Sequence, residues 1–175
     1  MFDAVILARS GSKKIKNKNL INLNGITLIE KIIYEAKKSK KIQSIYFLTD
    51  SKKYANLAYL AGAKIPFLRT KKISSDNSRD FDTFEFFYKW LKKNKITISR
   101  YFVHLRVTSP FVSSVDIDRA INKMSLTKNA DSLKSVELID HYTPYKMWKL
   151  KNNQLMEPLV KNTKINEPWN SPRQN

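Results

Sequence analysis

The residues best suited to chemistry follow the first apolar run of the sequence. The run Ala4–Ala8 leads directly into the polar stretch Arg9–Asn19. Its small residues are Ser10, Gly11 and Ser12, and its basic residues include Arg9, Lys13, Lys16 and Lys18. Small residues let backbone N–H groups approach a ligand, and cationic side chains offer charge for phosphate oxygens. The stretch predicts an anion-binding loop, although a flexible basic loop after a strand would have the same spacing.

Neither of the common nucleotide-loop patterns is present in this stretch. A Walker A loop needs GxxxxGKS/T, and a dinucleotide-binding turn needs GxGxxG. Three further polar stretches follow apolar segments: Thr49–Ser51, Arg69–Asp80 and Arg106–Pro110. In parallel sheets, ligands bind beyond the carboxyl ends of the strands. We therefore expect all four stretches to line one edge of a sheet.

The elements that must position these stretches alternate along the chain. Apolar segments predict strands over residues 3–8, 44–50, 63–68, 100–107 and 131–138. Amphipathic spacing predicts helices over residues 27–41, 51–63, 81–94 and 113–126. Capping pairs are expected at Thr27 with Glu30 and at Asp82 with Glu85, and Gly62 should end the second helix. The alternation predicts a single α/β domain over residues 1–175 with a mostly parallel, Rossmann-like sheet.

Composition limits the classes of function. The chain has 175 residues, 42% of them apolar, and no cysteine, which excludes disulfides, thiolate metal sites and cysteine nucleophiles. The net charge is +18, but 26 of the 33 basic residues are lysines spread along the whole chain. This distribution favours a solvated basic surface over a nucleic-acid site. No apolar run approaches a membrane span and no signal peptide is recognisable, so we expect a cytoplasmic protein.

Several segments resemble a known enzyme family. The segment ARSGSKKIKNKNLINLNGITLI (8–29) resembles the opening of the acylneuraminate cytidylyltransferases, which activate sialic acids and related sugar acids. FLTDS (47–51), GAKIPFLRTKKISSD (62–76) and HLRVTSPFVSSVDIDRAI (104–121) are similar to later blocks of the family, in the same order. TPYKMWKL (143–150) and NSPRQN (170–175) resemble elements of part of it. The resemblance implies a three-layer nucleotidyltransferase-like fold.

The resemblance also implies a reaction. These enzymes join CTP to the anomeric hydroxyl of a nonulosonic sugar acid and release pyrophosphate, normally with Mg²⁺. The implied catalytic residues are Arg9 and Arg173. The implied nucleotide-binding residues are Arg9, Ser10, Gly11, Ser12, Lys13, Lys18, Asn19, Arg69, Asp76 and Asp80. Arg106 and Ser109 stand in the block that faces the sugar acid, and an arginine there could hold a carboxylate bidentately. The implied partners are CTP and the sugar acid, with no nucleic acid or membrane, and the intact homologue is expected to be a homodimer.

The sequence departs from the family pattern at identifiable positions. Lys14 replaces a glycine, Thr70 and Val107 replace prolines, and Phe86 stands where a histidine is usual. The family's metal-binding aspartate pair is not in this sequence, so Mg²⁺ ligands are expected beyond its end. Asp116 and Asp118 are not nominated in their place, because residues two apart on a helix face different directions.

Two functions are consistent with these residues. The first is a cytidylyltransferase of C-terminally truncated form, and the second is a non-catalytic nucleotide- or polyanion-binding remnant of one. His104 is expected to be a packed strand residue. Without the resemblance, Arg69 would be expected on the surface and Arg106 in an ordinary salt bridge.

Overall fold

The structure is a computed structural model that describes residues 1–12, 15–136, 147–151 and 155–159. The chain forms two compact units, Met1–Leu133 and Lys134–Asn175. Within the described residues, no helix is long and apolar enough to cross a membrane.

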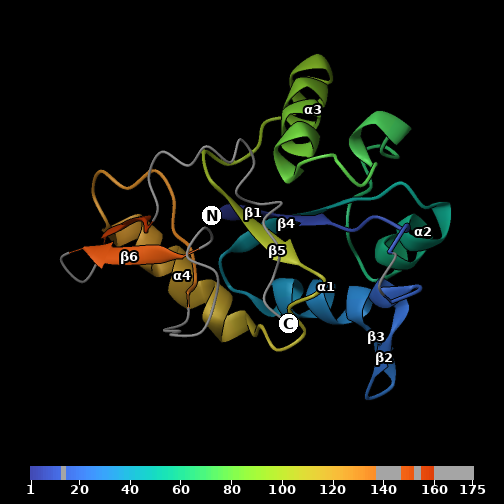
Figure 1. Cartoon of the computed structure of the whole chain (residues 1–175), viewed down its shortest axis with the longest axis horizontal. Coiled ribbons are helices and arrows are strands. Elements are labelled where there is room, and N and C mark those ends of the chain that lie inside the picture. The colour runs from blue at the N-terminus through green and yellow to red at the C-terminus, as the bar shows by residue number, and fades with distance from the viewer. Residues whose placement is uncertain (13–14, 137–146, 152–154, 160–175) are drawn as a thin grey trace. The chain divides into compact units, whose positions relative to one another are not determined.

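A parallel sheet lies at the centre of the first unit. It contains β1 (Phe2–Leu7), β4 (Ile42–Leu48) and β5 (Phe102–Arg106), in the order β4-β1-β5. On the central strand, Val5 is paired with Tyr46 on one side and with His104 on the other. The predicted α/β class with a parallel sheet is confirmed (Figure 1).

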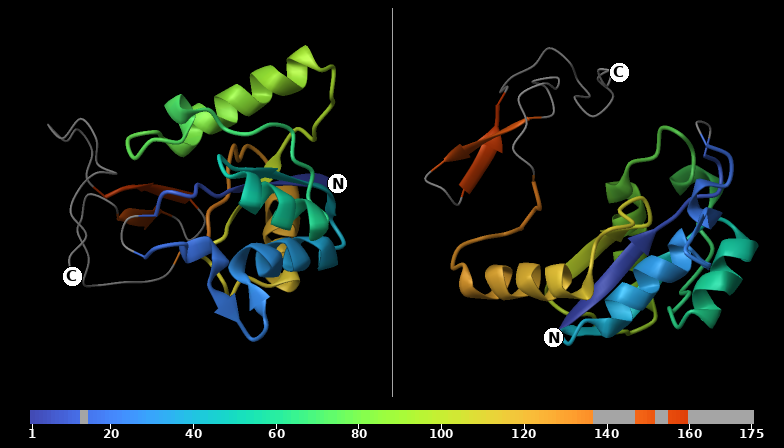
Figure 2. Two further views of the ribbon diagram at one scale, coloured as in Figure 1. Left: turned by 90° about the vertical axis from the view of Figure 1, so that its right-hand side faces the viewer. Right: turned by 90° about the horizontal axis from the view of Figure 1, so that it is seen from below.

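Helices cover both faces of this sheet. The helices are α1 (Leu28–Lys38), α2 (Lys52–Leu60), α3 (Asp80–Lys93) and α4 (Ser114–Leu126). Figure 1 and Figure 2 show α3 on the face opposite α1 and α2. The three layers follow from the two-residue period of strands, which sends neighbouring side chains to opposite faces.

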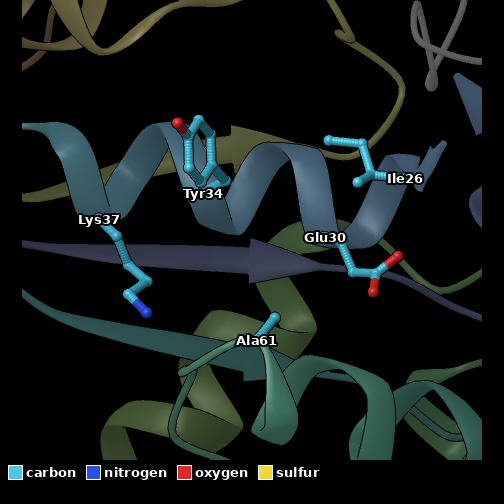
Figure 3. Close-up of a pocket in the computed structure, with 5 residues that line it drawn as sticks. All are labelled: Ile26, Glu30, Tyr34, Lys37 and Ala61. Carbon is cyan, nitrogen blue, oxygen red and sulfur yellow. The ribbon is translucent and has the colours of Figure 1, made fainter. Parts of the chain in front are cut away.

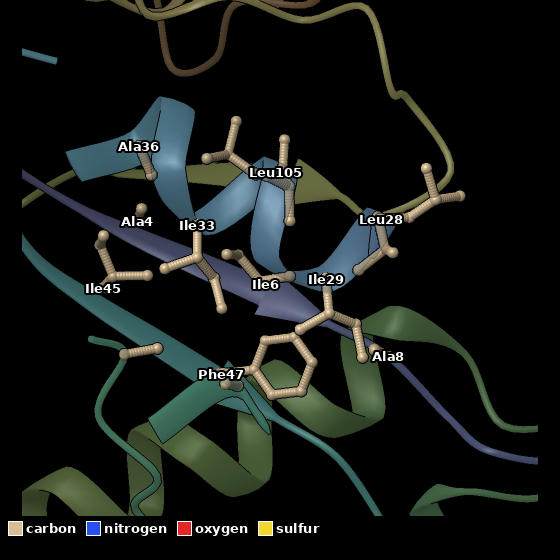
Figure 4. Close-up of a cluster of buried hydrophobic side chains, with 14 of the residues drawn as sticks. Ala4, Ile6, Ala8, Leu28, Ile29, Ile33, Ala36, Ile45, Phe47 and Leu105 are labelled. Atoms are coloured by element: carbon tan, nitrogen blue, oxygen red, sulfur yellow. The ribbon is translucent and has the colours of Figure 1, made fainter. Parts of the chain in front are cut away.

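Two clusters of buried side chains hold the layers together. Ala4, Ile6 and Ala8 face α1, where Ile29 and Ile33 are fully buried (Figure 4). The alternate residue Val5 faces α3 with Tyr46 and Leu48 of β4, and this cluster includes Phe87 and Leu91 of α3. Small residues on the α1 face of β1 let that helix approach closely, which fits the amphipathic pattern predicted for it.

Local chemistry sets the helix ends. The Thr27 hydroxyl and the Glu30 carboxylate form the predicted capping box at the start of α1. At the end of α2, Gly62 has φ +105°, its N–H donates to the Tyr59 carbonyl, and the Ala63 N–H donates to the Ala58 carbonyl. These bonds form a Schellman motif, in which glycine accepts the left-handed conformation at little cost.

The start of α3 differs from the prediction. Asp82 was expected to cap the helix with Glu85, but the cap is Arg79, three residues earlier, and α3 begins at Asp80. Asp82 lies inside the first turn and accepts hydrogen bonds from the Arg79 backbone N–H at 2.9 Å and from its guanidinium at 3.1 Å. An acidic residue in this turn interacts favourably with the helix dipole, which explains the shift.

Several short elements were missed or mispredicted. The segment 63–68 forms only isolated bridges, at Lys64 and Leu68, and no continuous strand. Residues 131–136 form no strand either. Neither β2 (Asn22–Leu23) nor β3 (Ile26–Thr27) was predicted, although Gly25 marks their turn with φ +90°. Two 3₁₀ turns, η1 (Lys18–Leu20) and η2 (Lys71–Ile73), were also missed.

The second unit contains an antiparallel pair of strands. β6 (Trp148–Lys151) pairs with β7 (Leu155–Pro158), and the Leu159 N–H donates to the Met147 carbonyl beyond the pair. The Lys134 ammonium lies 5.2 Å from the ring centroid of Trp148. This hairpin was not predicted from the sequence.

Candidate functional site

Contacts join all four predicted polar stretches. The Ser10 N–H donates to an Asp50 carboxylate oxygen at 2.8 Å, which joins the first stretch to the second. The Arg69 N–H donates to the Thr49 carbonyl at 2.8 Å, which joins the second stretch to the third. Two ion pairs then connect the third stretch to the first and the fourth: Arg9 with Asp76 and Arg106 with Asp80, each at 2.7 Å. The expectation that these stretches gather at one sheet edge is confirmed.

The loop after β1 is closed by internal hydrogen bonds. Asp50 accepts both the Ser10 N–H and the Ser10 hydroxyl, the latter at 3.0 Å. The Ser12 N–H donates to the Ser10 carbonyl at 2.9 Å. Three small residues were expected to offer backbone donors. Among the described residues, the N–H groups of Ser10 and Ser12 already donate to acceptors, whereas the Gly11 N–H does not.

Asp50 is a site residue that sequence reasoning missed. It stands at the carboxyl end of β4, within the block FLTDS, and its carboxylate fixes the loop that follows β1. The sequence signal was its place in a polar stretch directly after a buried strand. What the sequence could not show was that the neighbouring strand would bring Ser10 within hydrogen-bonding distance.

Asn19 holds the loop that follows β1 through a hydrogen bond to its backbone. It is buried, and its side-chain amide donates to the Arg9 carbonyl at 3.1 Å. Lys18, the other nucleotide-binding candidate in this part of the chain, begins the 3₁₀ turn η1 and is half-buried. Lys13 lies outside the described residues, as does Lys14, the departure from the family pattern. In this structure Asn19 therefore orients the backbone of Arg9.

Arg69 is the buried cation of the site. Its side chain is 9% exposed, and its Nε and Nη2 atoms both donate to the Ile73 carbonyl. Burial lowers the pKa of the Arg69 guanidinium. The negative charges of Asp50 and Asp80 partly offset this lowering. No carboxylate within the described part of the chain forms an ion pair with it. A desolvated guanidinium without a direct counter-charge is well suited to an anionic or carbonyl ligand.

Arg106 and Asp80 form an ion pair in the structure. Arg106 ends β5 and Asp80 begins α3, and their side chains are 60% and 49% exposed. Asp80 was expected on the nucleotide side, whereas its contact is with the residue expected to face the sugar acid. Ser109, the second sugar-acid candidate, forms a turn in which its N–H donates to the Arg106 carbonyl at 3.0 Å.

His104 is packed within the same strand end. Its ring meets Phe84 of α3 edge-on, with centroids 5.0 Å apart. Burial lowers the pKa of His104, and the nearby Arg106 charge lowers it further. The expectation of a packed strand histidine is confirmed.

The described residues contain no group of three or more His, Asp or Glu side chains that could hold a metal ion. Asp116 instead caps α4 by accepting from the Ser113 hydroxyl, and Asp118 accepts from the Ser39 hydroxyl and the Lys40 N–H. Both carboxylates are thus engaged in hydrogen bonds within the fold. Arg173, the second catalytic candidate, lies outside the described residues.

A separate hollow of about 470 Å³ lies beside α1 (Figure 3). Its lining residues are Ile26, Glu30, Tyr34, Lys37 and Ala61. Hydrogen bonds from Thr27 occupy Glu30 and lower the pKa of its carboxyl group. None of the lining residues belongs to the four polar stretches, so the hollow is not part of the candidate site.

The fold and the site together define a class. A parallel sheet with helices on both faces, and with arginines gathered beyond its strand ends, is typical of α/β proteins that bind anionic ligands at that edge. A family model described as "Cytidylyltransferase" matches residues 4–168, and the chain belongs to this family.

Similar proteins agree with this assignment. The chain is 33% identical over 137 residues to the CMP-N,N'-diacetyllegionaminic acid synthase of Legionella pneumophila, covering 77% of this chain and 58% of that protein. It is 28% identical over 138 residues to the post-translational flagellin modification protein B of Campylobacter coli, covering 75% and 56%. The chain thus spans little more than half the length of these relatives.

A solved structure supports the fold. The structure of CMP:2-keto-3-deoxy-manno-octonic acid synthetase complexed with CTP matches with a TM-score of 0.57 and 18% identity. The match covers 70% of this chain and 46% of that one. The nucleotidyltransferase-like fold predicted from the sequence is confirmed.

Proposed function

We propose that this protein takes part in transferring CMP from CTP to the anomeric hydroxyl of a nonulosonic sugar acid. The hydroxyl oxygen attacks the α-phosphorus, the bond to the β-phosphate oxygen breaks, and pyrophosphate leaves while the hydroxyl proton is lost. Membership of the cytidylyltransferase family and the names of its relatives support the proposal. The sugar acid is of the sialic, legionaminic or pseudaminic type.

The observation that carries the proposal is the gathering of three arginines at linked strand-end stretches. Arg9 follows β1, Arg69 follows the segment that bridges to β4, and Arg106 ends β5. Nucleotidyl transfer is catalysed mainly by positioning and by neutralising phosphate charge, which arginines supply. Each of the three is held differently, so they are not interchangeable.

We assign the roles by the surroundings of each arginine. Arg9 contacts the CTP phosphates and offsets charge on leaving pyrophosphate, because it follows the small-residue loop. Arg69 serves the cytidine side, where its buried guanidinium can donate to a carbonyl or phosphate oxygen. Arg106 holds the sugar-acid carboxylate. Lys13, Lys18 and Asn19 complete the nucleotide side, and Arg173 supports catalysis.

Two carboxylates of the chain must be displaced before the CTP phosphates can bind Arg9 and the Ser10 donors. Asp76 occupies Arg9, and Asp50 occupies the donors of Ser10. The triphosphate carries several negative charges, so it can replace one carboxylate at an exposed arginine. Mg²⁺, which would supply further charge neutralisation, has no fitting ligand set in the described ranges.

The test is a pyrophosphate-release assay with CTP, Mg²⁺ and a panel of nonulosonic acids. Release that depends on both CTP and one of the acids supports the proposal. CTP binding measured by calorimetry, without release for any acid, would favour a non-catalytic nucleotide-binding protein. Binding of DNA and RNA with a steep salt dependence would instead favour the polyanion-binding alternative.

A further inference from the structure

Only one nitrogen of the Arg106 guanidinium, Nη2, forms a hydrogen bond in the described residues. Its Nη2 donates to the Asp80 carboxylate at 2.7 Å, and the described residues give the group no other hydrogen bond or ion pair. A guanidinium carries five N–H donors in a fixed planar fork. Most of that fork is therefore still available to a ligand, and the side chain is 60% exposed.

Both partners stand at the ends of packed elements. Arg106 is the last residue of β5, which pairs with β1 along its length. Asp80 is the first residue of α3, a helix anchored by the buried side chains of Phe87 and Leu91. The N-terminus of a helix favours a negatively charged side chain, which suits a carboxylate at this position. The contact fixes the guanidinium between two rigid supports.

We propose that Asp80 is a positioning residue that presents Arg106 to the carboxylate of the sugar acid. This inference rests on the proposed function and moves Asp80 from the nucleotide side to the acid side of the site. Asp80 restrains one N–H group, and the remaining N–H groups form two parallel hydrogen bonds to the substrate carboxylate. The restraint reduces the side-chain freedom that Arg106 would lose on binding.

The opposite role for Asp80 makes a different prediction. If Asp80 competed with the substrate for Arg106, its removal would free the cation and tighten acid binding. If Asp80 positions Arg106, its removal weakens acid binding even though one negative charge is lost from the site. The sign of the effect therefore separates the two roles.

The experiment is isothermal titration of the whole chain with two probes, measured separately. The acid probes are N-acetylneuraminic acid and N,N'-diacetyllegionaminic acid, and the nucleotide probe is CTP. Asp80→Asn is expected to weaken acid binding about fivefold, the upper range for an exposed ion pair, and to leave CTP binding unchanged. Asp80→Glu should restore part of the loss, because it keeps the carboxylate.

Two matched variants exclude a merely structural effect. Glu85→Gln removes another exposed carboxylate of α3, which pairs with Lys89 at 2.7 Å, and should leave acid binding unchanged. In an Arg106→Ala background, Asp80→Asn should have no further effect, because it acts only through Arg106.

Three results would overturn the inference. Tighter acid binding by Asp80→Asn would make Asp80 a competitor, and weaker CTP binding with unchanged acid binding would return it to the nucleotide side. An equal loss from Asp80→Asn with and without Arg106 would show that it does not act through the arginine. In each of these cases the wild-type chain still binds the acid, and the proposed function stands. A wild-type chain that binds CTP but none of the acids contradicts the proposed acid specificity, and the inference falls with it.

Discussion

At the scale of single residues, the arginines of the site differ in what holds them. Arg9 has a 37% exposed side chain in an ion pair, whereas Arg69 is buried on a backbone carbonyl. Exposed ion pairs contribute little to stability, so a substitution at Arg9 tests binding almost alone. A substitution at Arg69 changes both ligand binding and the free energy cost of burying a charge, so the two effects must be measured separately.

Replacing Arg9 by alanine should abolish CTP binding and leave the melting temperature within about 2 °C of wild type. The reason is that Arg9 supplies phosphate charge but only one exposed ion pair, to Asp76. Calorimetric titration with CTP and a thermal melt check the two parts. Arg119→Ala, an exposed arginine of α4, is the control and should retain CTP affinity. Unfolding of the Arg9 variant would assign the residue a structural role.

Replacing Arg69 by methionine should remove CTP binding while changing the free energy of unfolding by less than about 1.5 kcal/mol. Methionine of similar length removes both the desolvated charge and its bonds to the Ile73 carbonyl, and these contributions oppose one another. The Thr83 hydroxyl, which also donates to that carbonyl at 3.3 Å, still satisfies it. Urea unfolding and CTP titration measure the two quantities. A loss of several kcal/mol with CTP binding intact would contradict the assignment.

The sequence predicted which polar stretches gather at the sheet edge but not how their side chains pair. Position at the carboxyl end of an apolar segment was enough to place Arg9, Arg69 and Arg106 near one edge. Their counter-ions could not be predicted, because Asp76 and Asp80 lie in or next to an irregular stretch whose path depends on tertiary contacts. Burial of Arg69 was missed for the same reason.

At the scale of elements, local signals predicted the start of α1 and the end of α2 but not the start of α3. Thr27 caps α1 as predicted, and Ser51 and Ser113 accept backbone N–H groups at the starts of α2 and α4. The expected strand over 63–68 failed because Pro66 cannot donate to a ladder, and the segment forms only isolated bridges. The short hairpins carry too few residues for a periodic pattern.

Replacing Gly62 by alanine should lower the free energy of unfolding by about 1 kcal/mol or more. Gly62 has φ +105°, and an added Cβ would lie 3.0 Å from the Lys37 ammonium. Gly11→Ala is the control, since nothing lies within 4 Å of its Cβ position and its φ is not positive. Urea unfolding compares the two variants. Equal losses would show that the left-handed turn is not what Gly62 is needed for.

Acid should weaken the start of α1 through Glu30. Hydrogen bonds from the Thr27 hydroxyl and N–H hold the pKa of Glu30 below its ordinary 4.5. A carboxyl group whose pKa is lowered by folding stabilises the protein above its unfolded pKa, and that contribution is lost as the pH falls through the folded pKa. Thr27→Val should therefore destabilise the protein near neutral pH, with a difference from wild type that shrinks below about pH 4.5.

Unfolding curves in urea at several pH values check this expectation. Thr70→Val is the control, because Thr70 also precedes a helical turn but makes no side-chain cap. A Thr27→Val deficit that stays constant down to pH 3 would mean that Glu30 does not carry the effect.

At the scale of the whole molecule, charge is the dominant property. The formal net charge is +18, and the charges are mostly lysines spread along the chain. Such a charge opposes the compact state through self-repulsion and favours solubility. The alternation of strands and helices was sufficient to predict the fold class, since it depends on chain pattern more than on any particular contact.

Raising the salt concentration from 0.02 to 0.3 M should raise the melting temperature. Mobile ions shorten the Debye length from about 20 to below 10 Å and so screen the repulsion between lysines. Differential scanning calorimetry in sodium chloride measures the shift, and an uncharged solute at matched osmolarity is the control. A melting temperature that falls with salt would show that attractive ion pairs outweigh the repulsion.

The central strand β1 also constrains how the gene can change. Its neighbours pair with it on both sides, and its alternate residues Ala4 and Ile6, or Val5 and Leu7, serve different helical layers. Loss of one codon here would exchange the two faces along part of the strand, so it would disturb both cores at once. Codon loss in the turn at Asn24 and Gly25 touches neither core. Evolution can therefore resize the β2–β3 hairpin while β1 keeps its length.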